Sequence, residues 1–110
     1  MPGGRASRDK GNRMERAIVR AFQDKGVAAE RVPLSGSAGG SYLGDFTVPV
    51  LGVDRVGEAK ARGTGFARLY DWLADRDFLV IKADRRPALV VLPLTLAVEI
   101  AAAAERGRTA

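Results

Sequence analysis

The sequence predicts one α/β domain over residues 1–110, built as a sandwich with a mixed central sheet. Three observations lead to this class. The length of 110 residues suits a single domain. The content of 46% hydrophobic and 28% charged residues is ordinary for a globular protein. Finally, the spacing of apolar residues gives the element order α-β-β-β-α-β-β-α, which is typical of layered α/β folds.

The first helix is predicted over residues 11–25, since apolar side chains fill one arc of a helical wheel and Gly26 follows as a stop. Glu15 falls inside the apolar arc, where a carboxylate is costly unless something pairs with it. Residues 1–9 are basic and show no periodicity, so they are expected to form a flexible arm.

The remaining elements follow from turn residues and from apolar runs. Pro33 limits the first extended segment to a sheet edge or a strand end. Leu51-Gly52 is the expected turn of a hairpin, although it is a poorer turn pair than Asn-Gly. In order, the elements are an extended segment (27–34), a Gly/Ser loop (35–44), the hairpin (45–61), a helix (64–76), two strands (77–83 and 88–94) and a last helix (95–106).

The composition excludes several kinds of chemistry. The chain has no cysteine and no histidine, so disulfides, His-based zinc sites and Ser-His or Cys-His catalysis are ruled out. It lacks a secretory signal and a membrane-spanning apolar run, and a cytoplasmic location without membrane partners is expected. The net charge of +5 favours a polyanionic partner.

Carboxylates and a lysine are predicted to converge on the hairpin. If Leu51-Gly52 is the turn, Asp45 lies directly opposite Glu58, and Lys60 shares the face of Glu58. Two carboxylates at this separation suit Mg²⁺, with Mn²⁺ as a substitute. A bulge at Pro49 would slip this register by one residue.

Glu15 could add a third carboxylate from the first helix, which would explain its place on the apolar arc. The alternative is that the hairpin carries an ordinary surface Glu–Lys pair and that Glu15 is an edge residue reaching solvent.

Phosphodiester chemistry suggests a role for each residue. Asp45, Glu58 and the backbone carbonyl of Ala59 would hold Mg²⁺, and Glu15 would bind a second ion or a metal-bound water. Lys60 would orient or deprotonate the attacking water. The catalytic residues would thus be Glu15, Asp45, Glu58 and Lys60. The candidates for DNA contact are Lys10 and Arg13, with a solvated face as the alternative, and Arg31 and Ser35, with a plain loop hydroxyl as the alternative for Ser35.

The stretch GNRMERAIVRAFQDKGVAAERVPLSGS, followed by GDFTV and GEAKA, resembles the archaeal-type and phage Holliday junction resolvases. These belong to the restriction-endonuclease-like, PD-(D/E)xK nuclease superfamily. The match spans residues 10–62, and Gly44-Asp45 stands where the superfamily pattern has Pro-Asp. The residues in the pattern's positions are, in order, Glu15, Arg31, Ser35, Asp45, Glu58 and Lys60.

The resemblance implies an α-β-β-β-α-β core with a mixed sheet and a C-terminal helix. It also implies a homodimer that nicks four-way DNA junctions in a prokaryotic or phage-infected cell, using Mg²⁺ and no small-molecule cofactor. The apolar residues available for a dimer interface could instead all be core; they are Phe66, Leu69, Tyr70, Trp72, Leu73 and 89–94.

Two other functions remain open on the sequence. The first is a nuclease of the same fold with another target, such as a flap, a nick or a defined duplex. The second is a non-catalytic DNA-binding module with a vestigial site.

Overall fold

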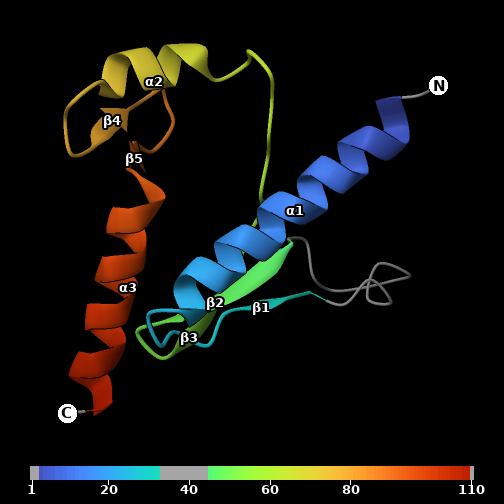
Figure 1. The fold of residues 1–110 in the computed structure, drawn as a ribbon. Coiled ribbons are helices and arrows are strands. Elements are labelled where there is room, and N and C mark those ends of the chain that lie inside the picture. The colour runs from blue at the N-terminus through green and yellow to red at the C-terminus, as the bar shows by residue number, and fades with distance from the viewer. Residues whose placement is uncertain (1–2, 33–44, 110) are drawn as a thin grey trace.

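The computed structural model describes residues 3–32 and 45–109. The element order is the predicted α-β-β-β-α-β-β-α (Figure 1). The helices are α1 (Gly3–Gln23), α2 (Ala67–Leu73) and α3 (Leu94–Thr109), and the strands are β1 (Glu30–Arg31), β2 (Phe46–Val50), β3 (Val53–Gly57), β4 (Leu79–Ile81) and β5 (Leu89–Val91). Within the described ranges, no helix combines the length and apolar character that crossing a membrane requires. The expected loop over residues 35–44 lies outside the described residues.

Helix α1 begins at Gly3, so the predicted start at Gly11 is wrong and residues 3–9 continue the helix instead of forming a separate arm. Arginine, alanine and lysine are good helix formers, and extending a helix that already exists adds a hydrogen bond for each residue fixed. The predicted stop is confirmed. Gly26 has φ of +85°, and the Val27 N–H donates to the Phe22 carbonyl at 3.0 Å, which closes the helix in a Schellman turn.

The hairpin forms in the predicted register. Strands β2 and β3 pair antiparallel from Phe46–Gly57 to Val50–Val53, around the Leu51-Gly52 turn. Pro49 introduces no slip, because its pair with Asp54 is a non-hydrogen-bonded one, where the amide would point away from β3. Gly57 is needed for the packing of Phe46, since a Cβ at position 57 would lie 2.5 Å from the phenyl ring.

Leu51 is an unfavourable residue for its position in the turn. It has φ of +56° and Gly52 has φ of +82°, the combination found in type I′ turns. Leucine in this left-handed conformation is strained, whereas asparagine tolerates it. We therefore expect Leu51→Asn to raise the free energy of unfolding by about 0.5–1 kcal/mol. Urea denaturation monitored by circular dichroism checks this; an unchanged or lower value would show that the turn is not strained.

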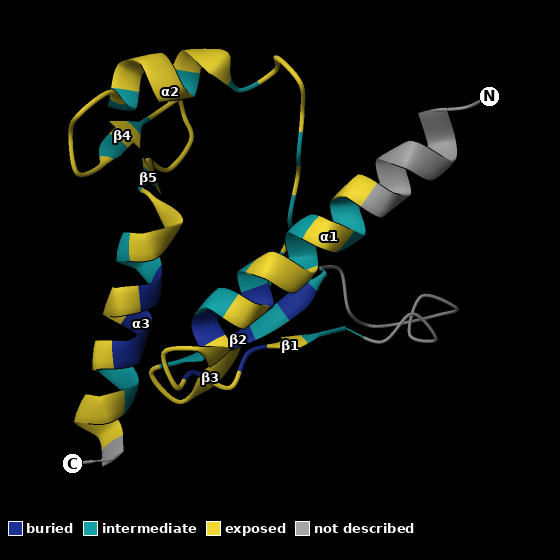
Figure 2. Ribbon diagram, viewed as in Figure 1, coloured by how far each residue is buried: buried dark blue, intermediate teal, exposed yellow. Residues whose placement is uncertain are grey.

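The core lies between the three-stranded sheet and two helices. Helix α3 packs against α1 and β2, and buried side chains line the contact (Figure 2). The buried residues come from α1, the segment after it, β2 and α3; they are Val19, Phe22, Val27, Ala29, Phe46, Val48, Val98, Ala101 and Ala102. Alternation along β2 directs Phe46 and Val48 toward the helices, while the intervening residues of β2 are only partly buried by the described part of the chain.

The predicted mixed central sheet is wrong for the described residues. Strands β1, β2 and β3 form one antiparallel sheet, and β4 and β5 form a separate antiparallel pair. Figure 1 shows α2 and this pair at one end of the molecule, joined to the rest by the segment after β3 and by α3. Each strand was expected from its own sequence, but an apolar run does not specify which strand it pairs with. The antiparallel β4–β5 pair needs only a short connection, whereas parallel pairing is non-local.

Candidate active site

Asp45 lies at the start of β2 and is tied to the segment that follows β3. Its backbone N–H donates to the Gly57 carbonyl at 2.7 Å. Its carboxylate Oδ2 accepts the backbone N–H of Ala59 at 2.8 Å. The regular strand pairing ends at the Phe46–Gly57 pair. Continued by one residue, it would place Asp45 opposite Glu58, but the Asp45 side chain bonds instead to the next residue, Ala59. The carboxylate is thereby fixed against the centre of the Glu-x-Lys segment.

Glu58 and Lys60 form an ion pair within this segment. Lys60 Nζ lies 3.2 Å from Glu58 Oε2, and the side chains of Lys60 and Glu58 are 56% and 49% exposed, respectively. Ala59, between them, packs against the core, whereas Glu58 and Lys60 on either side of it are exposed. An exposed ion pair of this kind contributes little to stability. Both groups are accessible to a ligand.

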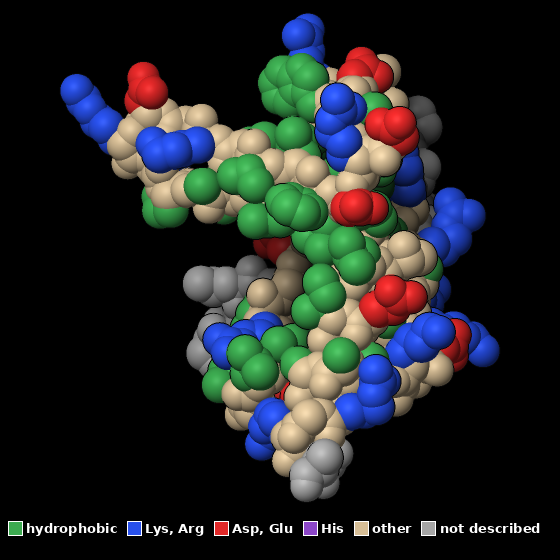
Figure 3. Space-filling view, turned by 90° about the vertical axis from the view of Figure 1, so that its left-hand side faces the viewer, with side chains coloured by type: hydrophobic (Ala, Val, Ile, Leu, Met, Phe, Trp, Pro, Cys, Tyr) green, Lys and Arg blue, Asp and Glu red, His purple; other side chains and the backbone are tan. Residues whose placement is uncertain are grey.

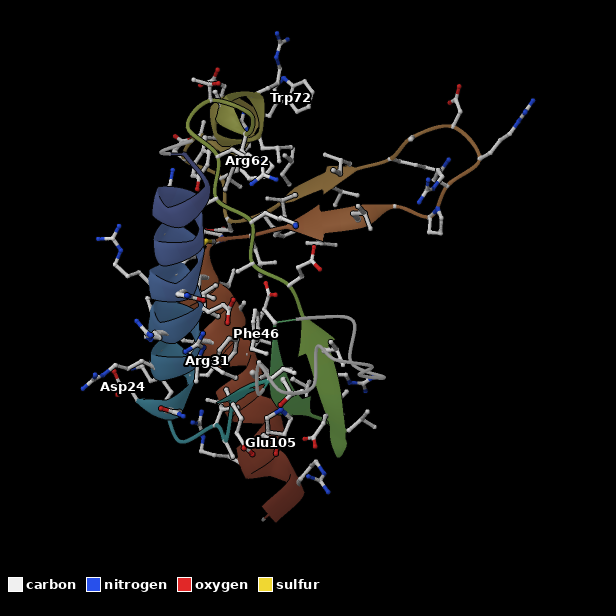
Figure 4. All side chains as sticks on the ribbon, turned by 90° about the vertical axis from the view of Figure 1, so that its right-hand side faces the viewer. Asp24, Arg31, Phe46, Arg62, Trp72 and Glu105 are labelled. Carbon is white, nitrogen blue, oxygen red and sulfur yellow. The ribbon has the colours of Figure 1, made fainter. Side chains whose placement is uncertain are left out.

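Glu15 is paired with Arg31. Glu15 Oε1 lies 3.1 Å from Arg31 Nε, and the side chain of Glu15 is only 15% exposed. Arg31 also donates from Nη2 to Asn12 Oδ1 at 3.2 Å, which holds the guanidinium along α1 (Figure 4). The sequence correctly indicated that Glu15 would need a partner, but the partner is a side chain of this protein.

The register explains this pairing. Arg31 is opposite Phe46 and therefore lies on the helix-covered face of the sheet, where Glu15 can reach it. Among the described residues there is no group of three acidic side chains that could hold a single metal ion. Asp45 and Glu58 are thus brought to one end of the hairpin without Glu15 as a third ligand. The sequence did contain a signal for the Glu15–Arg31 ion pair, because Arg31 is a cation in the extended segment that follows α1.

The structure brings Lys10 of α1 close to the Glu-x-Lys segment. Lys10 and Lys60 line one hollow, together with Arg62, which was not among the site residues predicted from the sequence. Arg13 is exposed on α1, and Ser35 lies outside the described residues. No periodic signal in the sequence marks Arg62, because it lies in the irregular segment between β3 and α2.

Fixed acidic groups, an accessible lysine and adjacent cations on a basic α/β domain are the features of a nuclease that acts on DNA. The comparison with protein families agrees with this class. The family described as archaeal Holliday junction resolvase (Hjc) matches residues 6–70, which is more than half of the chain. The chain belongs to the archaeal Holliday junction resolvase family.

Comparisons with curated proteins and with solved structures gave no significant match. The matched range contains all but the first three residues of α1, all three strands of the larger sheet and the start of α2. It therefore includes Asp45, Glu58 and Lys60. The helix, antiparallel strands and C-terminal helix are compatible with the nuclease fold.

Proposed function

We propose that this protein is a metal-dependent endonuclease that resolves four-way DNA junctions by paired hydrolysis of two phosphodiester bonds. The observation that carries the proposal is the bond between the Asp45 carboxylate and the Ala59 N–H at 2.8 Å. This bond fixes an acidic group beside Glu58 and Lys60 within the range that matches the resolvase family.

The residues present fit Mg²⁺, with Mn²⁺ as a substitute. Mg²⁺ sites at phosphates use one or two carboxylates and leave other positions to water and substrate. Asp45 and Glu58 would supply the carboxylates, and the Ala59 carbonyl would supply a third oxygen. When bound, the ion polarises the scissile phosphate and lowers the pKa of a coordinated water. Asp45 Oδ2 already accepts the Ala59 N–H, so its second oxygen is the better ligand.

Lys60 is the residue placed to act on the attacking water. Its ammonium is 3.2 Å from Glu58 and half exposed, so it can leave the ion pair when a phosphate enters. Its positive charge would then offset the charge that develops on the phosphorane-like transition state. As an ammonium, Lys60 would also orient the water; accepting the proton of the water would require its neutral amine form.

Glu15 is proposed to act through Arg31. The partly buried carboxylate fixes the guanidinium, and Arg31 can contact a phosphate with the donors that Glu15 and Asn12 leave free. We expect Glu15→Gln to lower the cleavage rate at least tenfold, because glutamine lacks the negative charge that pairs with Arg31. Thermal stability should stay close to wild type, because the glutamine side chain has nearly the same shape as that of glutamate.

Cleavage measured across a Mg²⁺ titration separates the roles considered for Glu15. If Glu15 acts through Arg31, the Mg²⁺ concentration for half-maximal rate stays unchanged in Glu15→Gln. A raised requirement would assign Glu15 to an ion instead, as the sequence alone suggested. A wild-type rate would remove Glu15 from the site.

We propose that the protein acts on branched DNA as a homodimer and that α2, β4 and β5 supply the dimer interface. Helix α2 has no buried residue, and Tyr70 is 75% exposed. Leu69 and Leu73 are among the residues lining an apolar hollow of about 510 Å³ between α2 and the chain around β5. Figure 3 shows hydrophobic side chains gathered on the projecting β4–β5 hairpin and next to it. The Cα radius of gyration, 15.7 Å, exceeds the roughly 13 Å of a compact chain of this length.

A panel of labelled DNA substrates tests the proposed activity. The protein should cut a mobile four-way junction with Mg²⁺, should not cut it with a chelator, and should leave linear duplex intact. Preferential cutting of flaps, nicks or a defined duplex would assign another target to the same fold. Junction binding without cutting, together with no heat of Mg²⁺ binding by calorimetry, would identify a non-catalytic DNA-binding module.

A further inference from the structure

A basic hollow lies between the N-terminal half of α1 and the segment that joins β3 to α2. It has a volume of about 580 Å³ and is lined by Lys10, Gly11 and residues 59–63. Figure 4 shows Arg62 on this connecting segment, near that half of α1. The hollow therefore begins at the Glu-x-Lys segment and extends along the chain beyond it.

The charged side chains that the structure describes in the lining of this hollow are all positive. Lys10, Lys60 and Arg62 contribute three cations, and none of the lining residues among those described is acidic. Lys60 is paired with Glu58, whereas neither Lys10 nor Arg62 forms an ion pair with a residue that the structure describes. Like charges gathered in this way repel each other unless an anion lies between them. The hollow is thus suited to an anionic ligand.

The walls of the hollow are suited to a backbone that approaches closely. Gly11 and Gly63 present no side chain, and a Cβ at either position would meet nothing within 4 Å. The lining includes no aromatic side chain on which a base could stack. Arg62 donates one bond from Nη1 to the Ala61 carbonyl at 2.9 Å, which leaves its other donors available. An arginine fork matches the oxygens of a phosphate.

We propose that this hollow binds a DNA backbone phosphate next to the one that is cut, with Arg62 and Lys10 as its contacts. The proposal rests on the proposed nuclease function and extends it. Arg62 follows Lys60 by two residues, so a strand that places one phosphate at Lys60 passes its neighbouring phosphate along the hollow. The contact would position the strand and would not take part in the chemistry.

Binding of a labelled four-way junction, measured by fluorescence anisotropy in EDTA, tests the contacts without cleavage. Arg62→Ala and Lys10→Ala should each weaken binding about tenfold. The slope of log K against log salt should become shallower by about 0.9 for one lost phosphate. Lys25→Ala is the matched control, because it removes the same charge from an exposed position just beyond the other end of α1. It should change binding less than twofold.

The double variant and modified DNA test whether both residues hold the same phosphate. The double variant Arg62→Ala/Lys10→Ala should lose less binding free energy than the sum of the losses in the two single variants. The losses in Arg62→Ala and Lys25→Ala should simply add in the corresponding double variant. A neutral methylphosphonate placed next to the mapped cut site should weaken binding by wild type and not by Arg62→Ala.

The outcomes separate this proposal from the one it extends. Suppose that wild type cuts junctions but Arg62→Ala binds them as tightly as wild type does, or that every methylphosphonate weakens binding by Arg62→Ala as much as it weakens binding by wild type. Either result would show that the proposed phosphate site is wrong, while the nuclease assignment stands. If wild type does not bind or cut branched DNA, both proposals fail. An unchanged thermal midpoint of Arg62→Ala ensures that a loss of binding is not a loss of folding.

Discussion

Replacing Asp45 with asparagine is expected to abolish cleavage and to leave DNA binding intact. The asparagine side-chain oxygen can still accept the Ala59 N–H, so the end of the hairpin keeps its shape. What is lost is the negative charge that would hold the metal ion. Because a bound ion supplies several kcal/mol of transition-state stabilisation, the cleavage rate should fall by about 10³-fold or more.

Single-turnover cleavage and junction binding, measured side by side, check this expectation. Without metal, Asp45→Asn should bind at least as tightly as wild type, since a carboxylate near the phosphates has been neutralised. Asp54→Asn is the matched control: it removes the same charge from an exposed position of β3, near the turn end of the hairpin. Cutting by Asp45→Asn at a rate near wild type would refute the assignment of the site.

The sequence predicted the hairpin well because local chemistry determines it. A two-residue turn fixes which residues are opposite one another, and the pairing from Phe46–Gly57 to Val50–Val53 is the one expected. The end of the hairpin was less predictable. Asp45 bonds to Ala59 instead of simply facing Glu58, because past the last strand pair the backbone no longer follows strand geometry.

The partner of Glu15 depends on tertiary packing, which periodicity does not report. Its apolar position correctly implied that its charge would be compensated. Whether a metal ion or an arginine compensates it depends on which face of the sheet α1 covers, and Arg31 is on that face. The same limit explains the mixed sheet that was expected, since strand patterns locate β4 and β5 but do not assign their neighbours. Arg62 was missed because a lone arginine after a motif has no periodic signal.

The second large effect is expected in a mixed dimer with one wild-type and one Lys60→Ala subunit. A productive resolution requires cuts in two strands of like polarity, and one small site does not reach both. A two-fold symmetric dimer presents two identical sites related as those strands are related. Lys60 suits this test because its ion pair with Glu58 is exposed, so its loss should leave the fold intact.

A supercoiled plasmid with an extruded cruciform distinguishes one cut from two. Two coordinated cuts give a linear product, whereas one cut releases the supercoiling and gives a nicked circle. The wild-type dimer should give mainly linear DNA, and the mixed dimer, isolated through two different affinity tags, should give nicked circles with at least about a tenfold loss of linear product. A mixed dimer carrying Lys25→Ala should behave like wild type. Sedimentation of the free protein at micromolar concentration should report twice the chain mass. A protein that sediments as a monomer when bound to DNA, yet still linearises the plasmid, would contradict the dimer.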